Sequence, residues 1–569
     1  MSRWIAAALS RPGSLRKALH FTRRVWRSRW GGYPSWKGFH VNGSPRPGEG
    51  SGRRVLLATS VGAHLPSVAV ESLLAAALRQ RGAEVHVLLC DGVLPACLDC
   101  DLRWYPNPKA QARLAARGPR NLCPTCFEPA LGAFKPLGVR IHRYSDWLRP
   151  EDVERARRLA GEIPAADIGR FAWDGMAVGE HARAGALRFF ARGDLAGEPA
   201  GEAVLRSFFE AALLTTFALR RFFDETPLDC AVMNHGIYVP QGLIGEAARK
   251  AGVRVVTWNP GYRKKTLVFS HGDTYHHTMM TEPVGLWEDM DFPPAEEERL
   301  MNYLRARWDG REDWISFQDR PRTSAEEVAR ELNLDRSRPS IGLLTNVVWD
   351  AQLHYPDNAF GGMLEWLEET LRYFSRRKDV NVIVRVHPGE VLGAIPSRQR
   401  VQDEIARRLG TLPDRIHVIG PESRLSTYAA MTLCDSVVIY GTKTGVELTS
   451  MGIPVVVAGE AWIRNKGFTM DAISREDYFR LLDRLPLRAR LPEDEVRRAR
   501  KYAYHFFFRR MIPVKALEPA GGWPPFRVSA RDAAALAPGA CPGLDTICGG
   551  ILTGADFVFA PERDAAAVR

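Results

Sequence analysis

A threonine- and lysine-containing loop is the stretch of this 569-residue chain whose residue types best suit phosphate binding. It follows the expected strand 436–440 and opens a short helix that Gly452 ends. The residues to which we assign roles are Thr442, Lys443, Thr444, Gly445 and Glu447. Free N–H groups and the positive end of a helix dipole favour an anion there. The alternative is an ordinary helix start with a capping box from Thr444 to Glu447.

A second loop with cationic residues follows the expected strand 381–386. Its candidate donor-binding residues are Arg385, His387, Pro388 and Glu390. Arg385 and His387 can both face a phosphate, and the proline fixes the turn. Parallel strands present their carboxyl ends at one edge of a sheet, so the two loops should face one crevice. Lys466 is a further candidate for stabilising a departing phosphate.

Two side chains are candidates for a catalytic base. His235 lies in the loop after the expected strand 229–233, and Asp350 lies in the loop after the expected strand 340–345. Doubly wound folds bind ligands at such strand ends. A lone loop histidine is also a common structural residue, so that alternative stays open.

Two Cys-x-x-Cys pairs follow the second expected strand, at Cys97, Cys100, Cys123 and Cys126. Each pair can place two thiolates on one tetrahedral metal ion. The pattern predicts a structural zinc site, with an iron–sulfur cluster, two disulfides or four reduced thiols as alternatives. Four thiolates would leave no open position for catalysis, so we expect this knuckle to fasten a long insertion to the sheet.

Apolar β-branched runs alternate with amphipathic helical stretches along most of the chain, which predicts an α/β fold with parallel sheets. The expected strands 53–59 and 84–90 and the helix 67–81 between them form the first βαβ unit. A second sheet is expected to begin near residue 340. The expected organisation is a basic arm and linker 1–50, a first Rossmann-like domain 51–335 with the cysteine knuckle at 97–126, a second 336–510, and a tail 511–569 that packs back.

The positive charge of the chain is concentrated at its beginning. Residues 1–50 contain ten Lys or Arg and one acid, and so supply +9 of the net charge of +12. The remainder is close to neutral, which argues against a long nucleic-acid groove. Basic and aromatic residues alternate over 1–45, so we expect contact with an anionic membrane surface. A disordered basic tail and a cleaved transit peptide are the alternatives.

Several motifs resemble those of one enzyme family. The motifs are Val386-His387-Pro388, the Thr442–Glu447 loop, and Gly452-x-Pro454-Val455. They are similar to motifs of the capsular polysaccharide biosynthesis glycosyltransferases, which include Kdo transferases and have a GT-B fold of two Rossmann-like domains. The resemblance covers roughly residues 340–480. It implies that His387, Pro388, Thr442 and Thr444 hold the nucleotide of a CMP-sugar donor.

From the residues and the resemblance together we expect a GT-B glycosyltransferase that works without a catalytic metal. Its partners would be a nucleotide-sugar and a capsule, other surface-polysaccharide or lipid-linked glycan acceptor. We expect a cytoplasmic location, with residues 1–45 on the inner face of the cytoplasmic membrane and no nucleic-acid partner. The rivals are a CDP-polyol phosphotransferase, a nucleotide-sugar epimerase, and a non-catalytic scaffold of a glycan-export complex.

Overall fold

The computed structural model describes most of the chain between residues 52 and 560. The described residues are 19, 21–26, 32–39, 52–308, 312–314, 317, 321–322, 324–351, 358–487, 489–521, 524–529 and 533–560. Much of the expected arm, including residues 1–18 and 40–50, lies outside them. No helix in the described ranges combines the length and the apolar character needed to cross a bilayer.

The first sheet has seven strands in the order β13-β6-β5-β4-β1-β2-β3. The strands are β1 (Arg54–Ser60), β2 (Glu84–Leu89), β3 (Arg140–Arg143), β4 (Cys230–Asn234), β5 (Arg254–Pro260), β6 (Thr266–His271) and β13 (Ile512–Pro513). Strands β1 to β5 are parallel, and Val55 of β1 aligns with both Val85 and Cys230. Strand β6 runs antiparallel to β5, and β13 runs antiparallel to β6. The strand order reverses at β1, between β2 and β4.

The second sheet has six strands, all parallel, in the order β12-β11-β10-β7-β8-β9. The strands are β7 (Ser340–Leu344), β8 (Asn381–Arg385), β9 (Ile416–Ile419), β10 (Ser436–Ile439), β11 (Val455–Val457) and β12 (Met470–Asp471). All residues of β7, β8, β10 and β11 are buried, as expected for strands covered on both faces. Here the order reverses at β7, so both sheets have the doubly wound arrangement that the sequence predicts.

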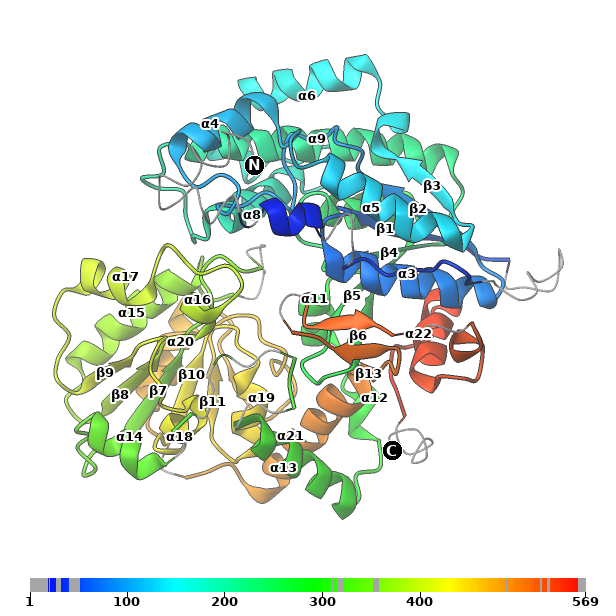
Figure 1. The fold of residues 1–569 in the computed structure, drawn as a ribbon. Helices are drawn as coiled ribbons and strands as arrows, with labels where there is room; N and C mark the ends of the chain where they lie inside the picture. Colours follow the sequence, from blue (N-terminus) through cyan, green and yellow to red (C-terminus); the bar gives the residue numbers. More distant parts are fainter. Residues whose placement is uncertain are drawn as a thin grey trace.

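Helices cover both faces of each sheet (Figure 1). Those of the first half are α3 (Leu65–Gln80), α4 (Pro108–Arg117), α5 (Pro124–Phe134), α6 (Pro150–Glu162), α7 (Ala165–Ile168), α8 (Val178–Phe190), α9 (Gly201–Glu225) and α10 (Gln241–Lys250). Those of the second half are α15 (Met363–Arg376), α16 (Gly389–Leu392), α17 (Val401–Leu409), α18 (Thr427–Thr432), α19 (Thr444–Ser450) and α20 (Arg475–Asp483).

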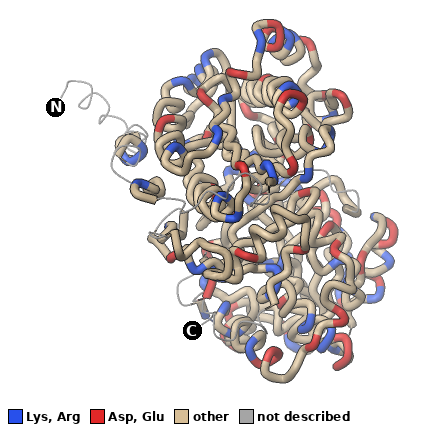
Figure 2. Tube along the Cα trace, turned by 90° about the vertical axis from the view of Figure 1, so that its right-hand side faces the viewer, with Lys and Arg blue, Asp and Glu red and all other residues tan. Residues whose placement is uncertain are grey.

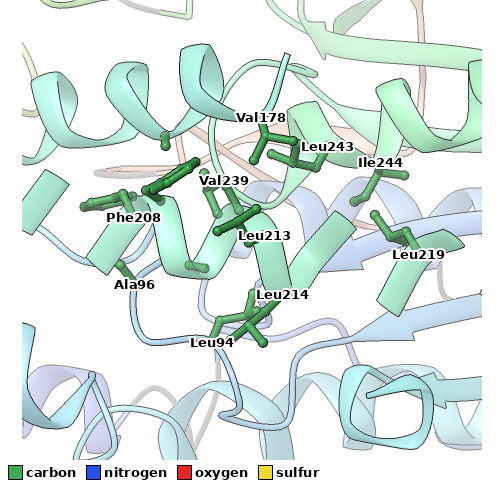
Figure 3. Packing of buried hydrophobic residues seen from close by; sticks show 14 of the residues in the cluster. Leu94, Ala96, Val178, Phe208, Leu213, Leu214, Leu219, Val239, Leu243 and Ile244 are labelled. Carbon is green, nitrogen blue, oxygen red and sulfur yellow. The ribbon is translucent and has the colours of Figure 1, made fainter. Parts of the chain in front are cut away.

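The long helix α9 is the centre of one core of the first half. Its apolar residues, among them Phe208, Leu213 and Leu214, pack with Leu243 of α10 and with the loop residue Val239 (Figure 3). The opposite face of the sheet is covered by α3, α5 and later parts of the chain. The core therefore fixes the positions at which β1 and β4 end.

The chain crosses twice between the two halves. Helices α11 (Tyr275–Thr281), α12 (Gly285–Glu288), α13 (Pro294–Trp308) and α14 (Ala325–Glu331) share a core with the second sheet and with α21 (Glu493–Tyr504). After the π-helical turn η3 (His505–Arg510), strand β13 returns to the first sheet, and α22 (Pro542–Thr553) packs on α3. In Figure 1 the orange and red C-terminal elements lie against the blue α3.

The expected metal knuckle is not supported. No group of three or more His, Cys, Asp or Glu residues in the described part of the chain is arranged to hold a metal ion. The thiols are used otherwise: Cys126 Sγ accepts the Ala63 N–H at 3.1 Å, and Cys123 Sγ donates to the Pro119 carbonyl at 3.3 Å. Cys97 packs on a small apolar cluster, and Cys100 is buried. The described residues therefore do not support the expected zinc or iron–sulfur site.

Candidate active site between the two sheets

Loops that follow the strands of one sheet contact loops that follow the strands of the other. Both points of order reversal contribute, and doubly wound sheets bind ligands there. The first sheet supplies His64, His235, Tyr238, Tyr262, Tyr275 and His276, and the second supplies Asp350, His387, Lys443 and Trp462. We call this set of residues the inter-sheet site.

His235 directly follows β4 and has a backbone conformation that is uncommon for a side-chain-bearing residue. Its φ is +61°, and its N–H donates to the Trp258 carbonyl at 3.1 Å. The ring stacks on Tyr238 with the centroids 5.4 Å apart. Burial lowers the pKa of His235, Asp350 raises it and Arg188 lowers it further. The Nδ1 atom is buried and has no hydrogen-bond partner among the described residues, so a neutral ring has an unused donor or acceptor there.

A hydrogen bond joins the two sides of the site. The Tyr238 hydroxyl donates to Asp350 Oδ1 at 2.9 Å and accepts the Ala351 N–H at 3.1 Å. The Arg188 guanidinium from α8 lies 5.4 Å from the centre of the Tyr238 ring. The two candidates for a catalytic base, His235 and Asp350, are therefore brought to one tyrosine from opposite sheets.

Aromatic rings also meet between the two sheets. Trp462, which follows β11, lies 5.4 Å from Tyr275, 5.9 Å from His276 and 5.9 Å from Tyr262, measured between ring centroids. His276 also lies 5.6 Å from His235, and its Nε2 is buried without a hydrogen-bond partner. The rings are tilted by 39–52° to one another, and a partly apolar aromatic surface of this kind suits a base or a sugar ring.

His387 follows β8 and is held in one orientation. Its N–H donates to Thr345 Oγ1, and its Nδ1 accepts the Gly389 N–H, both at 3.0 Å. Burial lowers the pKa of His387 to about 4, and Lys443 and Arg385 contribute to the shift. With Nδ1 as an acceptor, the neutral ring carries its proton on Nε2. His387 therefore offers an N–H donor at neutral pH, not the positive charge that we expected.

Lys443 is the cation of the phosphate-type loop, and it is partly neutralised. Its Nζ lies 2.7 Å from Glu447 Oε1 and 4.8 Å from the centre of the Tyr262 ring. The Glu447 carboxylate also pairs with Arg307 at 3.3 Å, and Arg307 pairs with Asp313 at 2.7 Å. Glu447 is 1 % exposed, so it positions Lys443 and does not present a free carboxylate for ribose hydroxyls.

The start of α19 differs from the expected capping box. Lys443 is the N-cap residue, no side chain caps the helix, and the Thr442 hydroxyl accepts the Thr444 N–H at 3.4 Å. Glu447 is turned away to its ion pairs, which is why the box does not form. A Cβ on Gly445 would overlap Ile463 Cδ1 and lie 2.8 Å from Ile439 Cδ1, so a larger residue here would require these two isoleucine side chains to move.

Arg385 serves the fold. Its guanidinium donates to the carbonyls of Gly420 and Ser423 and to Thr427 Oγ1, and the residue is 1 % exposed. Burial lowers the pKa of Arg385 to about 10. The side chain therefore ties β8 to the loop after β9 and to α18.

Two neighbouring candidates are also structural in their contacts. Pro388 is the N-cap residue of α16. Glu390 is buried, and its Oε2 accepts the Val401 N–H at 2.9 Å at the start of α17. Its Oε1 has no hydrogen-bond partner among the described residues, and burial raises the pKa of Glu390 to about 7.

Lys466 lies at the crossing between the two halves. Its Nζ donates to the carbonyls of Glu282 at 2.9 Å and Met280 at 3.3 Å. Burial lowers the pKa of Lys466 to about 8, opposed by Glu282. Glu282 itself pairs with His505 and Arg510 at 3.1 and 2.9 Å. Lys466 thus belongs to a buried polar cluster and not to the inter-sheet site.

Sequence reasoning missed Tyr238, Arg307 and Trp462 as members or supports of the site. The sequence could have indicated Tyr238, since it lies three residues after His235 in the same strand-exit loop. Arg307 comes from α13, far from the loop that it supports in sequence, so no local pattern could reveal it. Trp462 lies in a loop after β11, and its type alone does not distinguish a binding surface from a core.

No protein-family model matches this chain, and no curated protein does either. Among solved structures, a beta Kdo 2,4 transferase, KpsC of Thermosulfurimonas dismutans, is similar with 15 % identity, 48 % of this chain and 79 % of that chain covered, and a TM-score of 0.32. The spinosyn rhamnosyltransferase SpnG has 11 % identity, 80 % and 95 % coverage and a TM-score of 0.24.

A UDP-N-acetylglucosamine 2-epimerase is similar as well, with 13 % identity, 79 % of this chain and 92 % of that chain covered, and a TM-score of 0.22. TM-scores at this level do not establish a common fold. The assignment of two doubly wound sheets therefore rests on the observed strand order and pairing.

Proposed function

We propose that this protein transfers a sugar from a nucleotide-sugar donor to a glycan acceptor. The observation that carries the proposal is the Tyr238–Asp350 hydrogen bond. It joins the loop after β4, where His235 has an unbonded ring nitrogen, to the loop after β7 in the second sheet. Two doubly wound halves that meet at their ligand-binding edges are the arrangement of a two-substrate transferase with the GT-B fold.

The second sheet would hold the donor. Lys443 lies between Thr442 and Thr444 in the loop, and His387 offers an oriented N–H. These groups can balance charge that develops on a departing phosphate. The family resemblance of the motifs favours a CMP-sugar, with a UDP-sugar second. The metal-independent character of the transfer remains part of the proposal.

The first sheet would activate the acceptor. Burial keeps His235 neutral near pH 7, so its Nδ1 can accept a proton from an acceptor hydroxyl. Asp350, fixed by Tyr238, is the other candidate for this role. From the family resemblance we propose a capsule, another surface polysaccharide or a lipid-linked glycan as the acceptor. The reaction would take place in the cytoplasm, at the inner face of the membrane.

A thermal-shift panel of CMP, CDP, UDP, GDP and ADP tests the donor side. A nucleotide at a hundredfold excess over its dissociation constant should stabilise the folded protein by about 2.7 kcal/mol. Lys443→Ala should remove most of the shift. The matched control is Lys378→Ala, an exposed lysine that precedes β8 and so lies at the opposite end of that strand from His387.

Four outcomes separate the alternatives. Cytidine or uridine nucleotides that stabilise the protein through Lys443 support the proposal. Turnover of a UDP-sugar without any acceptor would indicate an epimerase, and turnover of a CDP-alcohol would indicate a polyol phosphotransferase. If no nucleotide in the panel raises the melting temperature, the non-catalytic scaffold becomes the favoured alternative.

A further inference from the structure

The described part of the N-terminal arm is fastened to the first domain by one arginine. Arg24 Nε donates to Thr125 Oγ1 at 2.6 Å, Nη2 donates to the Leu122 carbonyl at 3.0 Å, and Nη1 pairs with Asp99. The guanidinium also lies 5.4 Å from the centre of the Trp104 ring. Asp99 and Thr125 are the residues inside the two Cys-x-x-Cys pairs, so an arginine links these loops where a metal was expected.

A second part of the arm is fixed further along. The Tyr33 hydroxyl donates to the Gly62 carbonyl at 3.1 Å, and Trp36 is buried in the core beside α3. The described part of the arm is thus held at two places, through Arg24 and through Tyr33 and Trp36.

A cavity of about 820 Å³ lies between the arm and α5. The lining residues are mostly apolar or small: Phe21, Val25, Tyr33, Pro34, Ser35, Trp36, Lys37, Asn121, Pro124, Thr125, Glu128, Pro129, Gly132 and Ala133. The cavity is separate from the inter-sheet site, because the two share no lining residue.

Three exposed apolar side chains lie on the arm, and one of them, Phe21, lines the cavity. Leu19, Phe21 and Trp26 are 60, 40 and 56 % exposed. Only two other large apolar residues in the described ranges, Leu392 and Ile473, are comparably exposed, and both belong to the second half of the chain. Single exposed apolar residues are ordinary, whereas several on one short segment that lines an apolar cavity mark a binding surface.

The described parts of the arm carry positive charge, while the exposed Glu128 of α5 also lines the cavity. Arg23 and Lys37 are exposed there, and the described stretches 21–26 and 32–39 contain no acidic residue. In Figure 2 these stretches lie at the edge of the molecule near the N-terminus and show blue positions without red ones. Apolar side chains flanked by cations match an anionic bilayer surface, which presents acyl chains beneath negative headgroups.

We propose that the arm and α5 form a docking surface for an anionic lipid bilayer, with Phe21 and Trp26 entering the interface and lipid chains contacting the cavity. The proposal goes beyond sugar transfer and does not rest on it. It also assigns different roles to neighbouring arginines: Arg24 anchors the arm, and Arg23 faces the headgroups.

Co-sedimentation of the full-length protein with vesicles tests this surface. We expect binding to vesicles of phosphatidylglycerol and phosphatidylcholine at 50 mM salt, at least tenfold weaker binding at 500 mM salt, and weak binding to pure phosphatidylcholine. Phe21→Ser with Trp26→Ser should weaken vesicle binding at least tenfold. Leu392→Ser with Ile473→Ser removes the same number of exposed apolar side chains elsewhere and should leave it unchanged.

Three results would overturn the proposal. The first is the absence of binding to the anionic vesicles at low salt. The second is an equal loss in the Leu392 and Ile473 control. The third is a dimer in sedimentation equilibrium that the Phe21 and Trp26 substitutions dissociate, which would make this face an interface between copies. The nucleotide thermal shifts should be the same in all variants, so failure of this proposal and failure of the donor proposal are distinguishable.

Discussion

The two sides of the inter-sheet site differ in how their polar groups are satisfied. On the first-sheet side, His235 Nδ1 and His276 Nε2 are buried and have no hydrogen-bond partner among the described residues. On the second-sheet side, Arg385 is bonded to main-chain carbonyls, and Lys443 is paired with Glu447. The histidines on the first-sheet side have ring nitrogens without a hydrogen bond in the described structure, whereas Arg385 and Lys443 on the second-sheet side are bonded to other residues of the second half.

This difference separates binding groups from supporting groups. Buried polar atoms in folded proteins are nearly always bonded, so an unbonded one at a strand-exit loop suggests a missing ligand. A charge that is fully bonded within the fold contributes mainly to stability. Residue type alone would rank Arg385 above His235 as a functional residue, whereas the contacts reverse that order.

Replacing His235 gives the largest expected effect. His235→Asn should lower sugar transfer by about 10²- to 10⁴-fold, because a general base is lost. Asparagine tolerates the positive φ at this position, so the melting temperature should change little. The measurement is the rate of nucleotide release from the nucleotide-sugar whose nucleotide best stabilises the protein.

The control is His417→Asn, which alters a partly buried histidine on β9. Unchanged turnover in His235→Asn would show that the unbonded ring nitrogen does not mark the base, and Asp350 would become the better candidate.

Arg385 tests the supporting side. Arg385→Ala leaves the carbonyls of Gly420 and Ser423 without their donor, and an unsatisfied buried group costs about 1–3 kcal/mol. We therefore expect the free energy of unfolding in urea to fall by about 2 kcal/mol, with nucleotide affinity of the folded protein nearly unchanged. Arg336→Ala, at an exposed arginine, should change neither quantity. A stable Arg385→Ala protein that no longer binds nucleotide would place Arg385 among the binding groups.

Glu390 gives a smaller, pH-dependent effect. The pKa of Glu390 is raised to about 7 in the folded protein, above the ordinary value near 4.5. The folded state therefore keeps a proton that the unfolded state has lost, and stability falls as the pH rises from 4.5 through 7. Glu390→Gln removes this penalty while an amide oxygen can still accept the Val401 N–H.

The melting temperature of Glu390→Gln should exceed that of the unaltered protein at pH 8, by a free energy on the order of 1 kcal/mol, and the gain should disappear near pH 5. An equal gain at both pH values would show that the carboxyl group is not protonated in the folded state.

Much of the fold was predictable from local patterns. The expected strands named above overlap β1, β2, β4, β7, β8 and β10, because buried parallel strands are short apolar runs between turn residues. Strands β3 and β6 were missed: β3 is short and charged at both ends, and β6 pairs antiparallel next to a loop rich in polar residues. The observed ends of helices and strands differ from the expected ends by a few residues, since element ends are the part that local sequence patterns define least.

The sequence by itself determined that the candidate residues lie in loops after strands. His235 follows β4, Asp350 follows β7, His387 follows β8 and Lys443 follows β10, and parallel strands present these loops at one edge of each sheet. Only the tertiary structure decided where each side chain points. Arg385 turns to a loop that follows β9, Lys466 turns to the crossing between the halves, and Cys126 turns to the Ala63 N–H. The physical reason is that strand and helix positions follow from local periodicity, whereas the partners that satisfy a buried charge or thiol come from segments that are distant in sequence.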